Sequence, residues 1–354
     1  MGCHYLIVTL DVCYCCQMII FNAATIIIKK IYYIIYIKGW DSMRKVELHL
    51  HFDGSINVEY TNKLLGYDAS NELIDTNSSN LGEYLDKFKL PIKLLQDLDN
   101  IEMYAYLLAK DLEKDEVIYA EVRFCPLLHI EKNSIDDVVD AMKRGFSKVP
   151  AVKINLIFCM MRNFSFEDNC KIIELTKRFL GKGVVGIDLA GDEAKYKTSD
   201  FRELFQIIEK ESIPFTIHAG EADSYESVVD AITFGAKRIG HGIRSIESEV
   251  VMSKLEREKI VLEICPTSNI NTKAVLSMEI HPIKELINKG VLVTINTDNR
   301  TVSNTTLNRE YELLSKAFNF TDEDFIRFNL NAISCAFISE EEKMKLRRLL
   351  IIGR

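Results

Sequence analysis

The sequence lacks the features that mark several common classes of protein. It contains no basic cluster beyond pairs such as Lys29–Lys30 and Arg347–Arg348, and its formal net charge is −8. Nucleic acid and anionic membrane surfaces are bound through clustered Lys and Arg, so neither is an expected partner. No segment repeats with a period of about 20 to 50 residues, which excludes solenoids and propellers.

Cysteine spacing excludes a metal site built from thiolates. None of the five cysteines after residue 42 belongs to a CxxC pair, the spacing that such zinc sites use, and the one CxxC spacing of the chain, from Cys13 to Cys16, lies within residues 1–42. Those after residue 42 are odd in number and scattered, so they form no disulfide framework. This pattern indicates a reducing compartment, and we expect a cytoplasmic protein. The scattered cysteines are Cys125, Cys159, Cys170, Cys265 and Cys335.

Residues 1–42 differ from the rest of the chain, with apolar runs such as IIFNAATIII and IYYIIYI. A membrane anchor needs about 20 consecutive apolar residues, and Asp11, Gln17 and Asn22 interrupt this segment. A signal peptide needs a positively charged start, which is absent here. Because Met43 directly precedes RKVELHLHFDG, we expect a hydrophobic extension translated from upstream sequence, with the functional chain starting at Met43. An uncleaved extension and an exported protein are the alternatives.

Short apolar and β-branched runs recur from residue 45 onward, separated by segments with helical periodicity. Strands that are continuous apolar runs are typical of a parallel sheet covered by helices. Eight strands alternating with helices predict an α/β fold, a (β/α)8 TIM barrel, formed by residues 43–354 as one domain. The strands are expected within 45–54, 117–124, 152–158, 184–190, 214–220, 236–242, 260–266 and 291–298.

Two helical regions stand apart from this alternation. The segment at about 56–116 separates the first two strands and is mostly helical in pattern. Such an insertion at the end of a barrel strand is expected to form a lid or a pocket wall. A final helical stretch at 322–350 is expected to pack outside the barrel.

Polar residues gather at the predicted strand ends, where barrel active sites lie. The stretch KVELHLHFDG places His49 and His51 two apart, so both side chains lie on one face of the strand. Four of the seven histidines of the chain occur at strand ends. The strand-end set is His49, His51, Asp53, Arg123, Arg162, Gly191, Asp192, Glu193, His218, Glu221, His241, Ser268, Asn269, Asp298 and Asn299.

Part of this set has the chemistry of a catalytic metal site. Zinc and its neighbours bind imidazole nitrogen and carboxylate oxygen, and a catalytic site keeps one position open for water. A single histidine in an apolar strand is more often a packed core residue, but the whole constellation favours metal binding. His241 and Glu221 remain for proton transfer. The predicted ligands supply three nitrogens and one oxygen: His49, His51, His218 and Asp298.

The motifs HLHFDGS, DLAGDE, HAGE, RIGHGIR, CPTSN and NTDNR, in this order and spacing, resemble those of adenosine deaminases of the metal-dependent amidohydrolase superfamily. The similarity runs from about residue 43 to the C-terminus and includes YLDKFKLP in the insertion, whereas residues 1–42 take no part. The NTDNR form resembles bacterial members. The resemblance implies one Zn²⁺ per subunit and hydrolytic deamination of adenosine and 2'-deoxyadenosine to inosine and deoxyinosine plus ammonia, a purine-salvage reaction.

The resemblance also implies roles in the reaction. Glu221 would donate a proton to purine N1, which requires that its pKa be raised by burial and a nearby negative charge. His241 would orient the water or act as its base, and Asp298 would share the proton.

The remaining implied roles concern the substrate, a purine nucleoside. Asp53 would contact the ribose, His51 would border the same pocket, and Gly191 would offer its N–H near purine N3. Asn299 stands where the animal enzymes have a second aspartate. Its amide can donate to purine N7 as it stands, although the substitution bears on base selectivity.

Several alternatives stay open at this level. Deaminases of AMP or N6-methyl-AMP need cations for the 5'-phosphate, and Arg123 and Arg162 are isolated and possible structural residues. The sequence does not decide whether adenine or adenosine is the preferred substrate, or whether the ribonucleoside or the deoxyribonucleoside is. The end of the fourth strand, DLAGDE, lacks the carboxylated lysine of two-metal amidohydrolases, so one zinc is expected. A non-catalytic zinc-stabilised binding protein would have lost a ligand or the proton donor, and this sequence retains them all.

Overall fold

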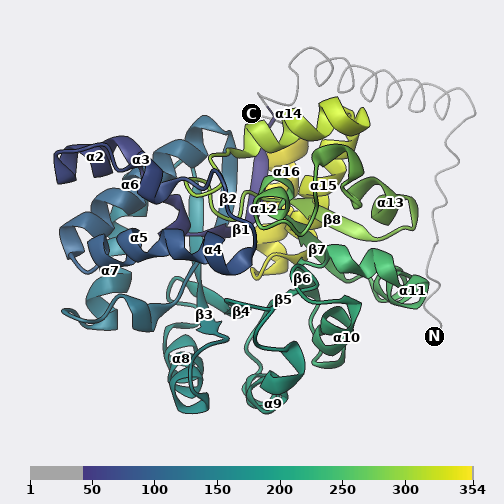
Figure 1. Ribbon diagram of the computed structural model, residues 1–354, viewed down its shortest axis with the longest axis horizontal. Helices are drawn as coiled ribbons and strands as arrows, with labels where there is room; N and C mark the ends of the chain where they lie inside the picture. The colour runs from purple at the N-terminus through teal and green to yellow at the C-terminus, as the bar shows by residue number, and fades with distance from the viewer. Residues whose placement is uncertain (1–42, 353–354) are drawn as a thin grey trace, which may run out of the picture. The chain divides into compact units, whose positions relative to one another are not determined.

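The computed structural model describes residues 43–352, and the predicted N-terminal extension lies outside these described residues. The strands occupy the centre of Figure 1 and helices surround them. The prediction of a (β/α)8 barrel is confirmed. The strands are β1 (Lys45–His51), β2 (Val117–Phe124), β3 (Lys153–Met161), β4 (Val184–Ala190), β5 (His218–Ala219), β6 (Arg238–His241), β7 (Val261–Ile264) and β8 (Leu292–Ile295).

The strands form two parallel four-stranded sheets, β1 to β4 and β5 to β8, joined in chain order. Single parallel bridges close the ring, one between Ile187 and Phe215 and one between Leu50 and Asp298. The predicted fifth strand at 214–220 is regular only at its end, where His218 and Ala219 pair with β6. The third strand runs three residues beyond its predicted end at 158, to Met161.

Helices cover the outside of the barrel, as the continuous apolar strands require. Some of their N-termini are capped by side chains; Ser134 accepts a hydrogen bond from the Asp137 N–H and Ser165 from the Asp168 N–H. The outer helices are α7 (Ile135–Ser147), α8 (Phe166–Phe179), α9 (Arg202–Lys210), α10 (Tyr225–Thr233), α11 (Glu249–Glu258) and α13 (Ile283–Asn288). Shorter elements in the loops are η4 (Pro126–Leu128), η5 (Thr198–Phe201), η6 (Ile243–Glu247), α12 (Pro266–Asn271) and η7 (Met278–Ile280).

The chain between β1 and β2 is helical. Its last and longest helix lies against α7 so closely that a Cβ atom at Gly145 would come within 2.3 Å of the Glu102 carbonyl oxygen. The elements are η2 (Asp53–Ser55), α2 (Val58–Leu65), α3 (Ser70–Leu73), α4 (Leu81–Leu85), η3 (Asp86–Phe88), α5 (Lys89–Leu94) and α6 (Leu98–Lys114). In Figure 1 they lie together on one side of the barrel.

Three helices follow the last strand: α14 (Leu307–Phe318), α15 (Asp322–Cys335) and α16 (Glu340–Ile352). The stretch predicted at 322–350 is therefore two helices, because the backbone at Ala336 is extended. Helix α15 contacts β1 and β8, and its Asn329 side chain accepts a hydrogen bond of 2.8 Å from the Val46 N–H. Within residues 43–352, no helix is both long and apolar enough to cross a membrane.

Candidate active site

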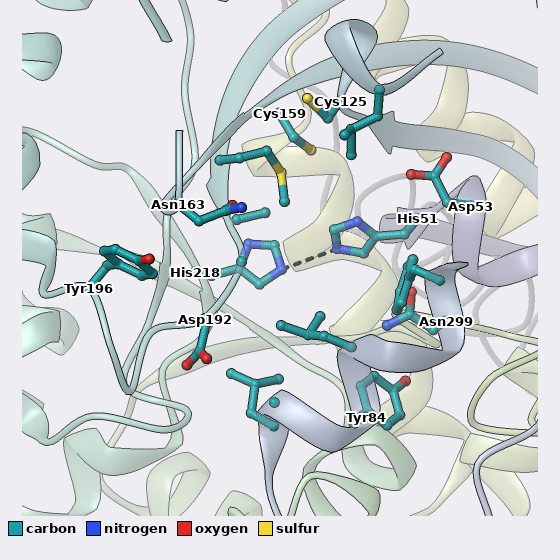
Figure 2. A pocket seen from close by; sticks show the side chains of 18 of the residues that line it. His51, Asp53, Tyr84, Cys125, Cys159, Asn163, Asp192, Tyr196, His218 and Asn299 are labelled. Carbon is teal, nitrogen blue, oxygen red and sulfur yellow. Dashed lines mark hydrogen bonds between the residues drawn. The ribbon is translucent and has the colours of Figure 1, made fainter. Parts of the chain in front are cut away.

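The four predicted metal ligands meet at the carboxyl ends of the strands. His49 and His51 come from β1, His218 from β5, and Asp298 follows β8. One ligand atom of each lies within 4.8 Å of those of the other three. Figure 2 shows His51 and His218 pointing toward one another, with 3.1 Å between their Nε2 atoms. The Asp298 Oδ1 atom lies 3.3 Å from the Nε2 atoms of both His49 and His51.

The backbone is strained at two of the predicted residues. Asp298 has φ of 60° and His241 has φ of 59°, a region that residues with a Cβ atom seldom adopt. The Asp298 peptide is held from both sides, because its N–H donates to His49 O at 2.9 Å and its carbonyl accepts from His51 N–H at 2.7 Å. Strain of this kind persists where surrounding contacts over-determine the backbone, and it often marks functional sites.

Two buried carboxylates orient the histidine rings from behind. Glu263 lies 3.0 Å from His49 Nδ1, and Asp188 lies 3.0 Å from His218 Nδ1. A carboxylate is an acceptor, so each Nδ1 carries the proton and each Nε2 lone pair is directed into the site. Arg123 is buried between the two carboxylates at 3.0 Å from each. Burial alone would raise the pKa of Asp188 and of Glu263, but the neighbouring cationic groups hold both well below the usual range.

Neither carboxylate was among the residues predicted for the site. Glu263 lies inside the apolar run IVLEICP and Asp188 inside VVGIDLA. A charged residue in a fully buried strand needs a partner, and that signal alone marks both positions. Arg123, at a strand end in the prediction, proves to be the partner that they share.

The arrangement fits a bound metal ion. His49 Nε2 is buried and makes no hydrogen bond within the described part of the chain, although Asp298 Oδ1 is 3.3 Å away. With the His49 proton on Nδ1, both His49 Nε2 and Asp298 Oδ1 are hydrogen-bond acceptors. A cation between them is therefore required for two acceptors to lie this close. His51 Nε2 and the Nε2 lone pair of His218 also converge here. Three imidazole nitrogens and one carboxylate oxygen form a donor set that divalent transition metals accept.

Glu221 lies beside the ligand cluster and is buried. Burial and the negative charge of Asp298 raise the pKa of Glu221 to about 7. Its Oε1 atom accepts a hydrogen bond of 2.9 Å from the Thr272 hydroxyl, and its Oε2 atom lies 3.5 Å from His241 Nε2. A carboxyl group with this pKa can donate a proton near neutral pH.

Glu193 fixes the loop that carries Glu221. Its buried carboxylate accepts hydrogen bonds from four consecutive backbone N–H groups, those of residues 220–223, at 2.6 to 3.2 Å. It also accepts a hydrogen bond from the Ser227 hydroxyl. Glu193 belonged to the strand-end set but had no predicted role. In the structure its hydrogen bonds hold the backbone of residues 220–223 in place.

A cavity of about 470 Å³ opens beside the ligand cluster. All four residues predicted to contact substrate line it: His51, Asp53, Gly191 and Asn299. Helix α4 and the following η3 supply an apolar wall, and Figure 2 shows Tyr84 of α4 beneath Asn299. Residues of the insertion thus line the cavity, and its role as a lid stays a prediction.

The side chain of Asn299 is confined from one direction. A Cβ atom at Gly54 would lie 2.0 Å from Asn299 Oδ1. The absence of a side chain at Gly54 therefore leaves the space that this oxygen occupies. In Figure 2 the amide nitrogen of Asn299 faces the cavity. The side chain therefore presents a hydrogen-bond donor to whatever the cavity holds.

Asp53 has a partner that the sequence analysis did not single out. His129 follows η4, is buried, and places Nε2 2.9 Å from Asp53 Oδ1. The residue lies several positions beyond the predicted end of the second strand, so its position in the chain gave no sign of this contact.

Cations are scarce in the cavity. Among the described residues that line it, Lys195 is the only lysine or arginine, and its ammonium pairs with Asp192 at 2.8 Å. Arg162 instead donates hydrogen bonds to the carbonyl oxygens of Tyr196 and His218, both at 2.6 Å. Arg162 and Arg123 are thus structural residues and do not face the cavity.

A parallel eight-stranded barrel with three imidazoles and a carboxylate gathered at the carboxyl ends of its strands defines a metal-dependent hydrolase. The model of the family described as adenosine deaminase matches residues 44–351 of the sequence. The chain belongs to the adenosine deaminase family, which confirms the resemblance of its motifs, and it is a hydrolytic deaminase by class.

Known relatives agree with this assignment over most of their length. An adenosine deaminase of Clostridium perfringens is 39% identical in an alignment of 328 positions that covers 88% of this chain and 99% of the relative. The solved N6-methyl-AMP deaminase of Arabidopsis thaliana has a TM-score of 0.77 at 25% identity, covering 88% of this chain and 96% of that chain. The adenine deaminase of Arthrobacter aurescens has a TM-score of 0.77 at 23% identity, covering 88% and 98%, and shares the fold.

Proposed function

We propose that this protein is a zinc-dependent adenosine deaminase. It would convert adenosine and 2'-deoxyadenosine, with water, to inosine and deoxyinosine plus ammonia. The observation that carries the proposal is the convergence of four metal-ligating atoms within 4.8 Å, beside a buried glutamate whose pKa is raised to about 7. The adenosine deaminase of Clostridium perfringens, which is matched over 99% of its length, supports adenosine as substrate.

We propose that one Zn²⁺ is held by four residues and supplies a nucleophile at neutral pH. A bound zinc ion lowers the pKa of its water to about 7. The orienting contacts of Glu263 with His49 and of Asp188 with His218 support binding, because such contacts fix the ring and raise the basicity of the ligand nitrogen. The ligands would be His49, His51, His218 and Asp298.

The residues around this site would move the protons. Glu221 in its protonated form would donate to purine N1, which makes C6 electrophilic toward water. Asp298 would accept a proton from the attacking water, since one carboxylate oxygen faces the histidine cluster while Oδ2 accepts a hydrogen bond of 2.6 Å from the Ser268 hydroxyl. Asp298 would pass this proton to the amino nitrogen, so that ammonia leaves as the C6–N bond breaks, and the proton of the new C6 hydroxyl would return to Glu221 and leave the carbonyl of the product.

Substrate orientation would come from the cavity wall. Asn299 would donate its amide N–H to purine N7, and Gly191 would donate its backbone N–H near N3. Asp53, paired with His129, would accept from a ribose hydroxyl. The backbone of Gly191 has φ of 104°, which only glycine adopts at little cost.

The cavity favours a nucleoside over a nucleotide. A 5'-phosphate is normally bound by several cations or by backbone N–H groups at a helix terminus. Lys195 alone is available among the described lining residues, and Asp192 already pairs with it. Adenine remains the closer competitor, because it shares every purine contact with adenosine and lacks only those of Asp53.

The test compares adenosine, 2'-deoxyadenosine, adenine, AMP and N6-methyl-AMP as substrates of the purified zinc-loaded protein, with ammonia release measured for each. We expect the highest kcat/KM with the two nucleosides. A higher kcat/KM for adenine or for either nucleotide would replace adenosine as the substrate. Absence of ammonia release from every purine would overturn the enzymatic assignment in favour of a zinc-stabilised binding protein.

A further inference from the structure

A chain of hydrogen bonds runs from the backbone behind the active site to His241. It starts at the Ile283 N–H, which lies 3.2 Å from Nδ1 of the buried His281. His281 Nε2 lies 3.3 Å from Asn269 Oδ1. The Asn269 Nδ2 atom then lies 3.0 Å from His241 Nδ1 and 3.3 Å from Glu221 Oε1.

The first link gives this chain its direction. A backbone N–H can only donate, so His281 Nδ1 must be an unprotonated acceptor. A neutral ring then carries its proton on Nε2 and donates to Asn269 Oδ1. Burial and the nearby His241 lower the pKa of His281 to about 3, which agrees with a neutral ring.

The second link orients the amide of Asn269. Because its oxygen accepts from His281, its nitrogen faces His241 and Glu221 and donates one hydrogen to each. Both acceptors suit this arrangement, since one is a ring nitrogen and the other a carboxyl oxygen. His241 Nδ1 must therefore be unprotonated, and a neutral His241 carries its proton on Nε2.

The position of that proton decides what His241 can do. His241 Nε2 faces Glu221 Oε2 at 3.5 Å, and the His241 ring centroid lies 4.9 Å from that of the predicted ligand His49. A nitrogen that already carries a proton donates a hydrogen bond and takes no further proton without becoming cationic. The Asn269 N–H occupies Nδ1 of His241 as an acceptor, so this ring carries a single proton and is neutral.

We propose that His281 and Asn269 are positioning residues that hold His241 in its Nε2–H tautomer. Within the proposed deamination, on which this role rests, His241 is then a donor to the oxygen of the attacking water. Acceptance of the water proton falls to Asp298. The sequence analysis left orientation and base catalysis open for His241, and the hydrogen-bond chain favours orientation.

The direct test is nuclear magnetic resonance of the imidazole nitrogens in the full-length, zinc-loaded protein. Two-bond correlations between ring protons and nitrogens distinguish the two tautomers. The signals of His241 and His281 are assigned by their loss in single substitutions. We expect the Nε2–H tautomer for both rings. A proton on Nδ1 of His241 overturns the proposal whether or not the protein deaminates adenosine, so this arm is independent of the proposed function.

Kinetics provide the second test, through matched variants of His281. Glutamine places an amide N–H where His281 Nε2–H lies, whereas leucine places no donor there. We expect His281→Leu to lower kcat by about 10- to 100-fold, the usual effect of losing an outer contact at a metal site. KM and zinc content should be unchanged, and His281→Gln should recover most of the loss. Equal losses in both variants would assign His281 a packing role only.

A double-substitution cycle separates action through Asn269 from general destabilisation. Asn269→Ala should lower kcat as His281→Leu does, and adding His281→Leu to it should cause no further loss. A further loss of the same factor would refute the route through Asn269. If His281→Leu does not fold, the glutamine variant and the tautomers of the unaltered protein still decide the question. Failure of the unaltered protein to release ammonia would instead count against the proposed function.

Discussion

Gly54→Ala should damage substrate orientation without touching a metal ligand or a proton donor. Gly54 lies in η2, and its φ is outside the left-handed region, so alanine suits the local backbone. The added Cβ atom would lie 2.0 Å from Asn299 Oδ1 and 2.6 Å from Asn299 Cγ. The Gly54 backbone has little freedom to retreat, because its carbonyl accepts hydrogen bonds of 2.9 and 3.2 Å from the N–H groups of Thr301 and Val302.

The size of the effect follows from the displacement. Cβ contacts shorter than 3.0 Å essentially never occur, so the Asn299 oxygen must move by about 1 Å. Asn299 Oδ1 has no hydrogen-bond partner among the described residues, so the contact with Gly54 is what limits it on this side. A misplacement of about 1 Å in a positioning group can lower the rate by about 100-fold. We expect kcat/KM for adenosine to fall by up to this factor, with overpacking lowering stability by about 1 to 3 kcal/mol.

The assay measures kcat/KM, bound zinc and the unfolding midpoint of the variant. Gly66→Ala is a matched control, since a Cβ atom there meets nothing within 4 Å while φ of 77° makes alanine strained. It should lower stability and leave kcat/KM unchanged. In an Asn299→Gly background the colliding side chain is absent, and Gly54→Ala should have no further effect. An unchanged kcat/KM in Gly54→Ala, or an equal loss in both backgrounds, would refute the argument.

Four other predictions follow from single residues or from the metal. Glu221→Gln should retain zinc and lose about 10²- to 10⁴-fold in kcat. Because the protonated acid is the active form and its pKa is about 7, kcat/KM of the unaltered enzyme should fall as pH rises through that value. Full activity of the variant, or a kcat/KM that rises with pH there, would contradict this role of Glu221. Chelation of the metal should abolish ammonia release and lower the unfolding midpoint, with zinc restoring both; activity that survives complete metal removal excludes the proposed chemistry. His129→Leu should raise KM for adenosine about 10-fold through loss of the 2.9 Å contact with the Asp53 carboxylate, and adenine, which lacks the ribose, should show no such change. Glu310, buried against the Thr267 N–H and the Thr305 hydroxyl, has its pKa raised by burial from 4.5 to about 7. Its contribution to stability is therefore fully present below the unfolded pKa and is lost as pH rises through the folded pKa. Glu310→Gln should remove a pH-dependent change of about 3 kcal/mol between those two values, which urea unfolding at several pH values between 4.5 and about 7 would check.

The sequence by itself determined the barrel and the four residues that converge at its carboxyl edge, whose role as metal ligands stays a prediction. Strand periodicity is local, so eight apolar runs alternating with helices identify the strands without any distant contact. Parallel strands of a barrel share one carboxyl edge, and polar residues at those ends must therefore lie near one another. His49, His51, His218 and Asp298 could be predicted as neighbours for this reason. The motifs added the family, and the proposed start at Met43 stays a prediction.

The tertiary structure alone decided which groups support that set. His49 and Glu263 are separated by 214 residues in sequence and lie 3.0 Å apart, and no local pattern pairs one buried carboxylate with one particular ring. His129 and His281 lie in loops away from strand ends, so their contacts with Asp53 and Asn269 depend on how the loops pack.

The same reason explains what the sequence left open at His241. Its position at a strand end showed that it belongs to the site, because that follows from the register of one strand. Which of its nitrogens carries the proton depends on a hydrogen-bond chain that enters from the loop before α13. Residue type and spacing thus determine which groups meet, and long-range packing determines their protonation and their roles.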